Sequence, residues 1–133
     1  MDTDAVYQDE LKAFLKRYGE ALMAGDLPTV ADHYTAPCLF LSDSASTAVD
    51  AHHEIAQLLK AAVGRLHDQG LVAAHPNVLR AEAVTEALVW TEVSWDYRDT
   101  HGHSAQPEIY RYVLRLNADV GPLIQVVIAM PEL

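Results

Sequence analysis

The sequence changes from a helical to a strand pattern at Gly70, and this change restricts the possible folds more than any other feature. Before Gly70, apolar residues recur every three or four positions, which is the spacing of one face of an α-helix. After Gly70 come three runs rich in β-branched and aromatic residues: ALVWTEVSWDYRD, EIYRYVLRL and LIQVVIAM. At 133 residues the chain has the length of one domain. The pattern therefore predicts a single α+β domain over residues 1–133.

Two helices are expected at the start of the chain. The first is about twenty residues long and ends at Gly25, and its apolar stripe consists of Leu11, Phe14, Leu15, Tyr18 and Leu22. Asp26 can cap a short second helix that includes Tyr34, and Pro37 ends this helix. The first helix thus places a phenol, that of Tyr18, among leucines on the face expected to be buried.

A strand and a third helix follow before the long strand runs. Cys38 to Ser42 is predicted to be a strand, and the third helix runs from about Ala51 to Gln69. A weaker strand, about Leu71 to Ala83, precedes the three strong runs. The expected order is helix, helix, strand, helix and four antiparallel strands.

Alternate residues of a strand lie on opposite faces of a sheet, so the strand runs can be divided into two faces. The predicted inner face includes Val93, Trp95, Tyr110, Tyr112, Val126 and Ile128. The outer face includes Trp90, Val113 and Val127, and the last strand is apolar on both faces. Because helices on one side can cover only one face, we expect a homodimer in which two open sheet faces cover each other.

The composition argues against several classes of partner. The net charge of −10 and pI near 4.9 repel phosphate backbones and anionic lipid surfaces, so neither nucleic acid nor a membrane is an expected partner. An acidic start with no apolar run behind it favours a cytoplasmic location. Cys38 is the only cysteine, and its apolar surroundings in the sequence indicate a buried structural thiol.

The seven histidines do not predict a metal site. His101 and His103 fall in an expected turn, while His52 and His53 point about 100° apart on a helix. Neither pair has two further ligands at a suitable spacing, so we expect no metal and no other cofactor.

Two segments resemble the nuclear transport factor 2-like superfamily, and the similarity covers nearly the whole chain. RYGEALMAGDL is similar to the first helix and turn of its ketosteroid isomerase and polyketide cyclase-like (SnoaL-like) branch, and EALVWTEVSWDY is similar to the long central strand. The resemblance implies a curved antiparallel sheet wrapped around the three helices, forming a cone with an apolar pocket.

The resemblance also implies site residues. The tyrosine that binds an oxyanion in steroid isomerases corresponds to Tyr18, and the second oxyanion donor corresponds to Tyr110. The general base corresponds to Ser42, and Asp43 could replace it only if a strand bulge turned this side chain inward. Glu108 could enter the site only if the strand register slipped by one residue. The alternative for Tyr18 is a core residue with a satisfied hydroxyl.

The expected pocket lining consists of Phe40, Ser42, Val93, Trp95, Tyr112, Val126 and Ile128. Three functions are compatible with such a pocket. One is a cofactor-independent acid–base enzyme, an isomerase, cyclase or dehydratase acting on a small apolar or planar molecule. The others are a non-catalytic module that binds such a molecule and a dimeric association domain.

Overall fold

The computed structural model describes residues 3–131, which form three helices and one six-stranded sheet. The elements in chain order are α1 (Thr3–Ala24), α2 (Leu27–Ala31), β1 (Tyr34–Leu41), β2 (Ser46–Val49), α3 (His52–Asp68), β3 (Leu71–Ala83), β4 (Leu88–Asp99), β5 (Glu108–Asn117) and β6 (Gly121–Ala129). Within these residues, no helix combines the length and the apolar character needed to cross a membrane.

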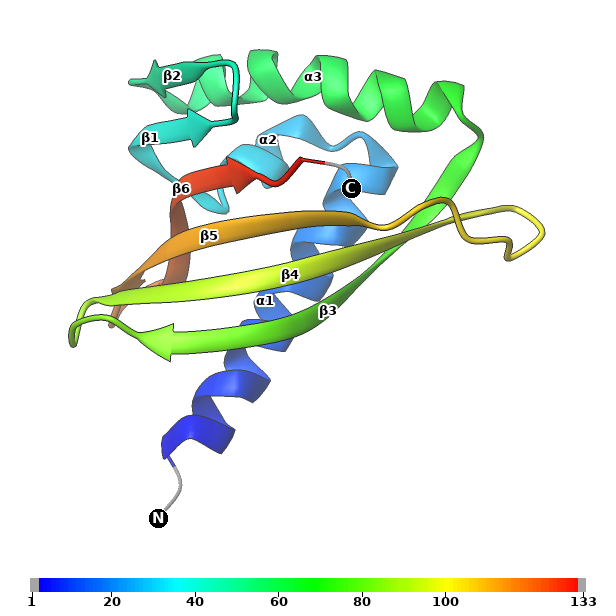
Figure 1. Ribbon diagram of the computed structural model, residues 1–133. Coiled ribbons are helices and arrows are strands. Elements are labelled where there is room, and N and C mark those ends of the chain that lie inside the picture. The colour runs from blue at the N-terminus through cyan, green and yellow to red at the C-terminus, as the bar shows by residue number, and fades with distance from the viewer. Residues whose placement is uncertain (1–2, 132–133) are drawn as a thin grey trace.

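The sheet has the strand order β2-β1-β6-β5-β4-β3 and curves around the helices. Figure 1 shows α1 passing behind the long strands β3, β4 and β5, while α3 runs along the top, near β1 and β2. Neighbouring strands are antiparallel except β1 and β6, which are parallel. The predicted α+β fold, with a curved sheet around three helices, is confirmed, and the parallel pair is an addition to it.

The main core lies between α1 and the inner face of the sheet. Its largest fully buried side chains are those of Trp95 and Tyr34, and its almost fully buried aliphatic members come from both layers: Leu11, Leu15, Val89, Val93, Leu114 and Ile124. Close packing explains Gly19 in the middle of α1, because a Cβ there would lie 2.9 Å from Cζ3 of Trp95. The helix and the indole of β4 are therefore in direct contact.

The second helix is shorter than predicted, and Tyr34 belongs to a strand. α2 ends at Ala31. Tyr34 is the first residue of β1, and it pairs with Ile124 of β6. Pro37 lies inside β1 and does not end a helix. The strand tolerates this proline because β1 pairs with β2 only from Cys38 onward, so no hydrogen bond from residue 37 to β2 is needed. The short strand β2 was not predicted. Only the last of its four residues, Val49, is buried, so its sequence has no alternation of apolar and polar residues.

An irregular pairing between β5 and β6 reverses the predicted faces of the last strand. Val113 pairs with Val126 whereas Leu114 pairs with Ile124, so Gln125 is an extra residue in β6. Beyond it, Val127 lies opposite the inward-facing Tyr112, and its side chain is 7 % exposed. The assignment of Val127 to the outer face was therefore wrong.

The bulge at Gln125 also changes the face on which two predicted lining residues lie. Val126 pairs with Val113, and Ile128 pairs with Arg111; both partners belong to the outer face. Val126 and Ile128 were predicted to point into the pocket, and this was wrong because one inserted residue moves every later side chain to the other face.

Candidate functional site

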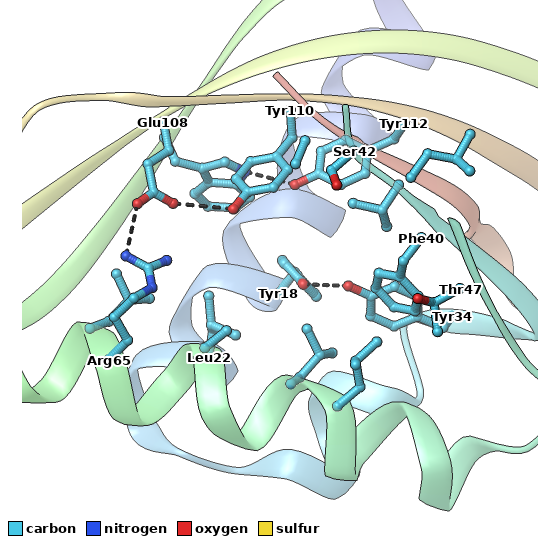
Figure 2. A pocket seen from close by; sticks show the side chains of 18 of the residues that line it. Tyr18, Leu22, Tyr34, Phe40, Ser42, Thr47, Arg65, Glu108, Tyr110 and Tyr112 are labelled. Carbon is cyan, nitrogen blue, oxygen red and sulfur yellow. Dashed lines mark hydrogen bonds and ion pairs between the residues drawn. The ribbon is translucent and has the colours of Figure 1, made fainter. Parts of the chain in front are cut away.

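A cavity of about 280 Å³ lies between the inner face of the sheet and α3. Its wall consists of residues from the helices α1 and α3 and from the strands β1, β2, β4, β5 and β6 (Figure 2). The volume is near the lower end of the ~300–1,000 Å³ range of small-molecule sites. The space therefore suits a molecule of about two rings.

The third helix supplies an apolar side of the cavity. Its lining residues follow a helical stripe: Leu58, Leu59, Ala62 and Leu66. Leu58 is 41 % exposed although it is a leucine, which places the opening of the cavity near this position. The stripe of α3 thus forms one side of the cavity at these positions.

Tyr18 and Tyr34 form a hydrogen-bonded pair at the cavity wall. Their hydroxyl oxygens lie 2.6 Å apart, and the two side chains are only 5 % and 1 % exposed. Burial is the main cause that raises the pKa of both Tyr18 and Tyr34. Both phenols therefore stay protonated at neutral pH. One of them donates the shared hydrogen bond, so the hydroxyl hydrogen of the other has no acceptor in the described part of the chain.

Trp95 and Tyr112 form a second buried pair. The indole Nε1–H of Trp95 donates to the hydroxyl oxygen of Tyr112 over 2.8 Å. Because an indole can only donate, Tyr112 is the acceptor and its own hydroxyl hydrogen remains available. Burial is the main cause that raises the pKa of Tyr112, so this hydrogen is retained at neutral pH.

Arg65 and Glu108 are the only charged residues among the described residues of the wall. Arg65 Nη1 donates to Glu108 Oε2 over 3.2 Å, and the Tyr110 hydroxyl donates to Glu108 Oε1 over 3.2 Å (Figure 2). Burial, followed by the charge of Glu108, raises the pKa of Tyr110 to about 12. The hydrogen bond to Glu108 is the main cause that raises the pKa of Arg65. This polar cluster joins α3 to the start of β5.

Most of the predicted site residues line this one cavity. Those that do are Tyr18, Phe40, Ser42, Trp95, Tyr110 and Tyr112. Val93 is completely buried in the core and is not among the lining residues, so its predicted contact with a ligand is not found.

Asp43 does not reach the cavity. It is exposed in the turn between β1 and β2, where the Ser42 N–H donates to the Ala45 carbonyl over 2.9 Å. No bulge turns its carboxylate inward, so the inward orientation on which the choice of Asp43 depended is not found. Ser42 does line the cavity, and the side chain that its hydroxyl contacts in the described part of the chain is Ser44, which is not a base.

The sequence interpretation missed several residues of the wall, among them Tyr34, Arg65 and Glu108. Tyr34 was assigned to a helix, and Arg65 was indistinguishable from other polar residues of α3. Glu108 had a readable signal, because it lies two positions before Tyr110 and alternate residues share a face. Glu108 lies opposite the buried Trp95 in the sheet and enters the wall without any slip in register.

The described residues contain no group of three or more histidine, cysteine, aspartate or glutamate side chains arranged to hold a metal ion. His52 and His53 are on the exposed side of α3, and the His52 ring nitrogen Nε2 lies 2.9 Å from the Tyr34 carbonyl. His101 and His103 stack on each other in the turn after β4.

Solved structures share the fold at low sequence identity. A cystatin-like domain of unknown function from Nostoc punctiforme aligns with a TM-score of 0.74 and 17 % identity, covering 100 % of this chain and 80 % of that one. A protein from Streptomyces avermitilis, provisionally named a dehydratase of the NTF2-like family, aligns with a TM-score of 0.69 and 12 % identity over 98 % and 99 % of the two chains.

A ketosteroid isomerase-like protein from Erwinia carotovora atroseptica aligns with a TM-score of 0.60 and 13 % identity, covering 89 % of this chain and 90 % of that one. At such identities the likeness establishes the fold alone. No curated protein matches the sequence significantly. The family described as NTF2-like protein (DUF6841) matches residues 9–131, and the chain therefore belongs to this NTF2-like family.

Proposed function

We propose that the cavity binds a small, largely apolar molecule through an oxygen atom that the buried phenols recognise. The observation that carries this proposal is that two buried pairs, Tyr18–Tyr34 and Trp95–Tyr112, each leave one hydroxyl hydrogen without an acceptor among the described residues. Buried polar hydrogens normally have a partner. An acceptor oxygen on a bound molecule would provide one.

The chemistry of the wall defines the class of ligand. The apolar side formed by α3 favours hydrocarbon rings, and the free phenol hydrogens favour an oxygen with lone pairs, such as that of a ketone. A two-ring ketone, 2-tetralone, is therefore a suitable probe. Tetralin has the same rings without the oxygen and is the matched comparison.

Calorimetric titration of the purified protein with both compounds tests the proposal. We expect saturable binding of each, with 2-tetralone tighter by about 3- to 10-fold, the worth of one net neutral hydrogen bond. A variant that fills the cavity, Ala62→Phe, should lose binding of both. Ala61→Phe, one residue away on the exposed side of α3, is the control and should bind like the parent. Absence of 2-tetralone binding to the parent would contradict the proposal.

Removal of one phenol hydroxyl separates recognition of the oxygen from burial of the rings. Tyr112→Phe preserves the ring but removes the hydroxyl that Trp95 and the ligand oxygen share. We expect 2-tetralone affinity to fall by about 3- to 10-fold and tetralin affinity to stay unchanged. A melting curve on the same sample verifies folding, because the unpaired indole N–H should lower the free energy of unfolding by about 1–3 kcal/mol.

Cofactor-independent acid–base catalysis on the bound molecule, as isomerisation, cyclisation or dehydration, is the second candidate function. The carboxylate of Glu108 in the cavity wall favours it. The names of two structural neighbours, ketosteroid isomerase-like and provisionally dehydratase, are from this class of chemistry. A binding module and an enzyme differ in whether that carboxylate exchanges a proton with the ligand.

A further inference from the structure

A second hollow in the surface lies beside the polar cluster of Arg65, Glu108 and Tyr110. This groove has a volume of about 480 Å³, and it shares those three residues and Ala129 with the wall of the cavity. Figure 2 shows Arg65 and Glu108 together at one side of the cavity, away from Tyr18. The polar cluster is therefore a partition between two neighbouring spaces.

The groove is mostly apolar beyond the partition. Among the described residues of its wall, five do not belong to the cavity, and only Gln106 of these has a polar side chain; the others are Pro107, Ile109, Met130 and Pro131. The Met130 N–H donates to the Ile109 carbonyl over 3.1 Å, which joins the start of β5 to the chain after β6. The groove therefore suits a short hydrocarbon chain better than a charged group.

The partition has both donors and acceptors to spare. Within the described part of the chain Arg65 donates one hydrogen bond, from Nη1 to Glu108, although a guanidinium has five N–H groups. Glu108 accepts from Arg65 and from Tyr110, so about two of its four acceptor positions remain. Because the opposite charges lie 3.2 Å apart, a third charge would be attracted by one and repelled by the other. A neutral group with both a donor and an acceptor fits this partition best.

We infer that the cavity and the groove are two parts of one ligand site, in which an elongated ligand passes between Arg65 and Glu108. The inference rests on the proposed function, because the rings of the ligand occupy the cavity with their oxygen at the phenols. A secondary amide lies at the partition, where its carbonyl accepts from Arg65 and its N–H donates to Glu108. An apolar chain beyond the amide lies in the groove. The ligand class is thus a cyclic ketone joined through an amide to a hydrocarbon chain.

The partition can open for such a ligand at little cost. The side chain of Arg65 comes from α3 and is 48 % exposed, whereas Glu108 belongs to β5. Solvent weakens an ion pair with so exposed a member, and the guanidinium can remain hydrated when it moves aside. The amide then replaces the hydrogen bond that the two side chains lose.

Calorimetric titration with three 2-tetralones substituted at C6, the end of the rings opposite the ketone, tests the inference. The substituents are an N-butyl carboxamide, the corresponding butyl ester and the free carboxylate. The amide should bind about 10-fold or more tighter than 2-tetralone, the effect of about two buried methylene groups. The ester has no N–H for Glu108 and should bind about 3- to 10-fold more weakly than the amide. The carboxylate has no chain for the groove and should bind no tighter than 2-tetralone.

Two variants assign these effects to the groove and to the partition. Met130→Ala shortens a residue of the groove that is not part of the cavity wall. It should bind the amide about 3-fold or more weakly and bind 2-tetralone like the parent, which also verifies folding. Glu108→Ala should bind the amide and the ester equally. The controls are Met23→Ala, outside both walls, and Glu82→Ala, which removes an exposed carboxylate of β3; both should behave like the parent.

Binding of 2-tetralone to the same samples separates this inference from the proposed function. If the parent binds 2-tetralone but binds the amide no more tightly, or if Met130→Ala binds the amide as the parent does, the groove is not part of the site and the proposed function stands. Tighter binding of the carboxylate than of the amide, or a parental preference for the amide in Glu108→Ala, would contradict recognition of a neutral amide at the partition. If the parent does not bind 2-tetralone, both proposals are contradicted.

Discussion

The hydroxyl of Tyr18 on α1 and the hydroxyl of Tyr34 at the start of β1 share one hydrogen bond of 2.6 Å. The rings are also in edge contact, with centroids 5.8 Å apart. Sixteen residues separate the two tyrosines, so this contact fixes the helix against the strand at the wall of the cavity. The buried phenols therefore serve the fold as well as the proposed ligand site.

The buried phenols predict how stability depends on alkaline pH. Burial raises the pKa of five tyrosines, and four of them are at most 5 % exposed: Tyr18, Tyr34, Tyr97 and Tyr112. Tyrosine in an unfolded chain has a pKa of about 10. Above that pH the unfolded state holds fewer protons than the folded state, so the free energy of unfolding falls as pH rises. Below about pH 10 these phenols contribute no pH dependence.

Parallel alkaline titrations monitored by absorbance at 295 nm and by far-ultraviolet circular dichroism check this prediction. Ionisation of the four buried phenols should coincide with loss of the circular dichroism signal. Full ionisation of the tyrosines near pH 10 with a native dichroism spectrum would show that these side chains are not buried as described.

Two helix glycines should respond in opposite ways to substitution by alanine. A Cβ on Gly19 would meet the Trp95 ring at 2.9 Å and the Ala74 carbonyl oxygen at 3.2 Å, whereas nothing lies within 4 Å of one on Gly64. Overpacking costs about 1–3 kcal/mol, and alanine gains up to about 1 kcal/mol in helix propensity. Gly19→Ala should therefore lower the free energy of unfolding by up to about 2 kcal/mol, and Gly64→Ala should raise it by about 0.5–1 kcal/mol.

Chemical denaturation of the two variants beside the parent measures both effects. Equal stabilisation by Gly19→Ala and Gly64→Ala would contradict the close contact between α1 and Trp95.

Cys38 should be unreactive in the folded protein. Its side chain is 3 % exposed, and burial raises the pKa of its thiol to about 11. Little thiolate is present at pH 8, and reagents have little access to it. Ellman's reagent should therefore react stoichiometrically in denaturant and only slowly in native buffer. Rapid reaction of one equivalent in native buffer would contradict the burial of β1 at this residue.

The outer face of the sheet is the surface on which we expect a second copy of the chain. Trp90, Val113 and Val126 are consecutive partners across β4, β5 and β6, so they form one row. All three are partly exposed, and Trp90 lies against the guanidinium groups of Arg80 and Arg111. Two such rows covering each other would bury this apolar surface.

Light scattering after gel filtration measures the oligomeric state. The parent should have the mass of a dimer, and Val126→Arg should shift it to a monomer because a charge enters the contact. Asn117→Arg, at the exposed end of β5, should remain dimeric. A monomeric parent, or a dimeric Val126→Arg variant, would contradict this use of the outer face.

Local sequence patterns predicted most helices and strands, but they did not predict which face of the sheet every strand residue lies on. The stripe from Leu11 to Leu22 and the stop at Gly70 are local properties, and α1, α3 and the long strands agree with them. The extra residue Gln125 reversed the faces of β6, because a bulge depends on how two strands pair and no glycine or proline marks it in the sequence. Alternation therefore placed Tyr112 correctly and Val127 incorrectly.

The part of the candidate site that lies on one strand could be predicted from the alternation of faces along that strand. Tyr110 and Tyr112 followed from alternation, and the same rule includes Glu108. Tyr34 could not be found this way, because its inward position depends on the parallel pairing of β1 with β6, two segments far apart in the chain. Asp43 failed for a similar reason: its direction is set by the turn that joins β1 to β2.

A crystal structure of the protein soaked with 6-bromo-2-tetralone tests the central claim most directly. Anomalous scattering locates the bromine, and the ketone oxygen is then placed from the density. We predict bromine inside the cavity, with the ketone oxygen within about 3.2 Å of the Tyr112 hydroxyl or of the Tyr18–Tyr34 pair. Bromine found only on the surface, or a ligand in the cavity whose oxygen contacts none of these phenols, would contradict the account.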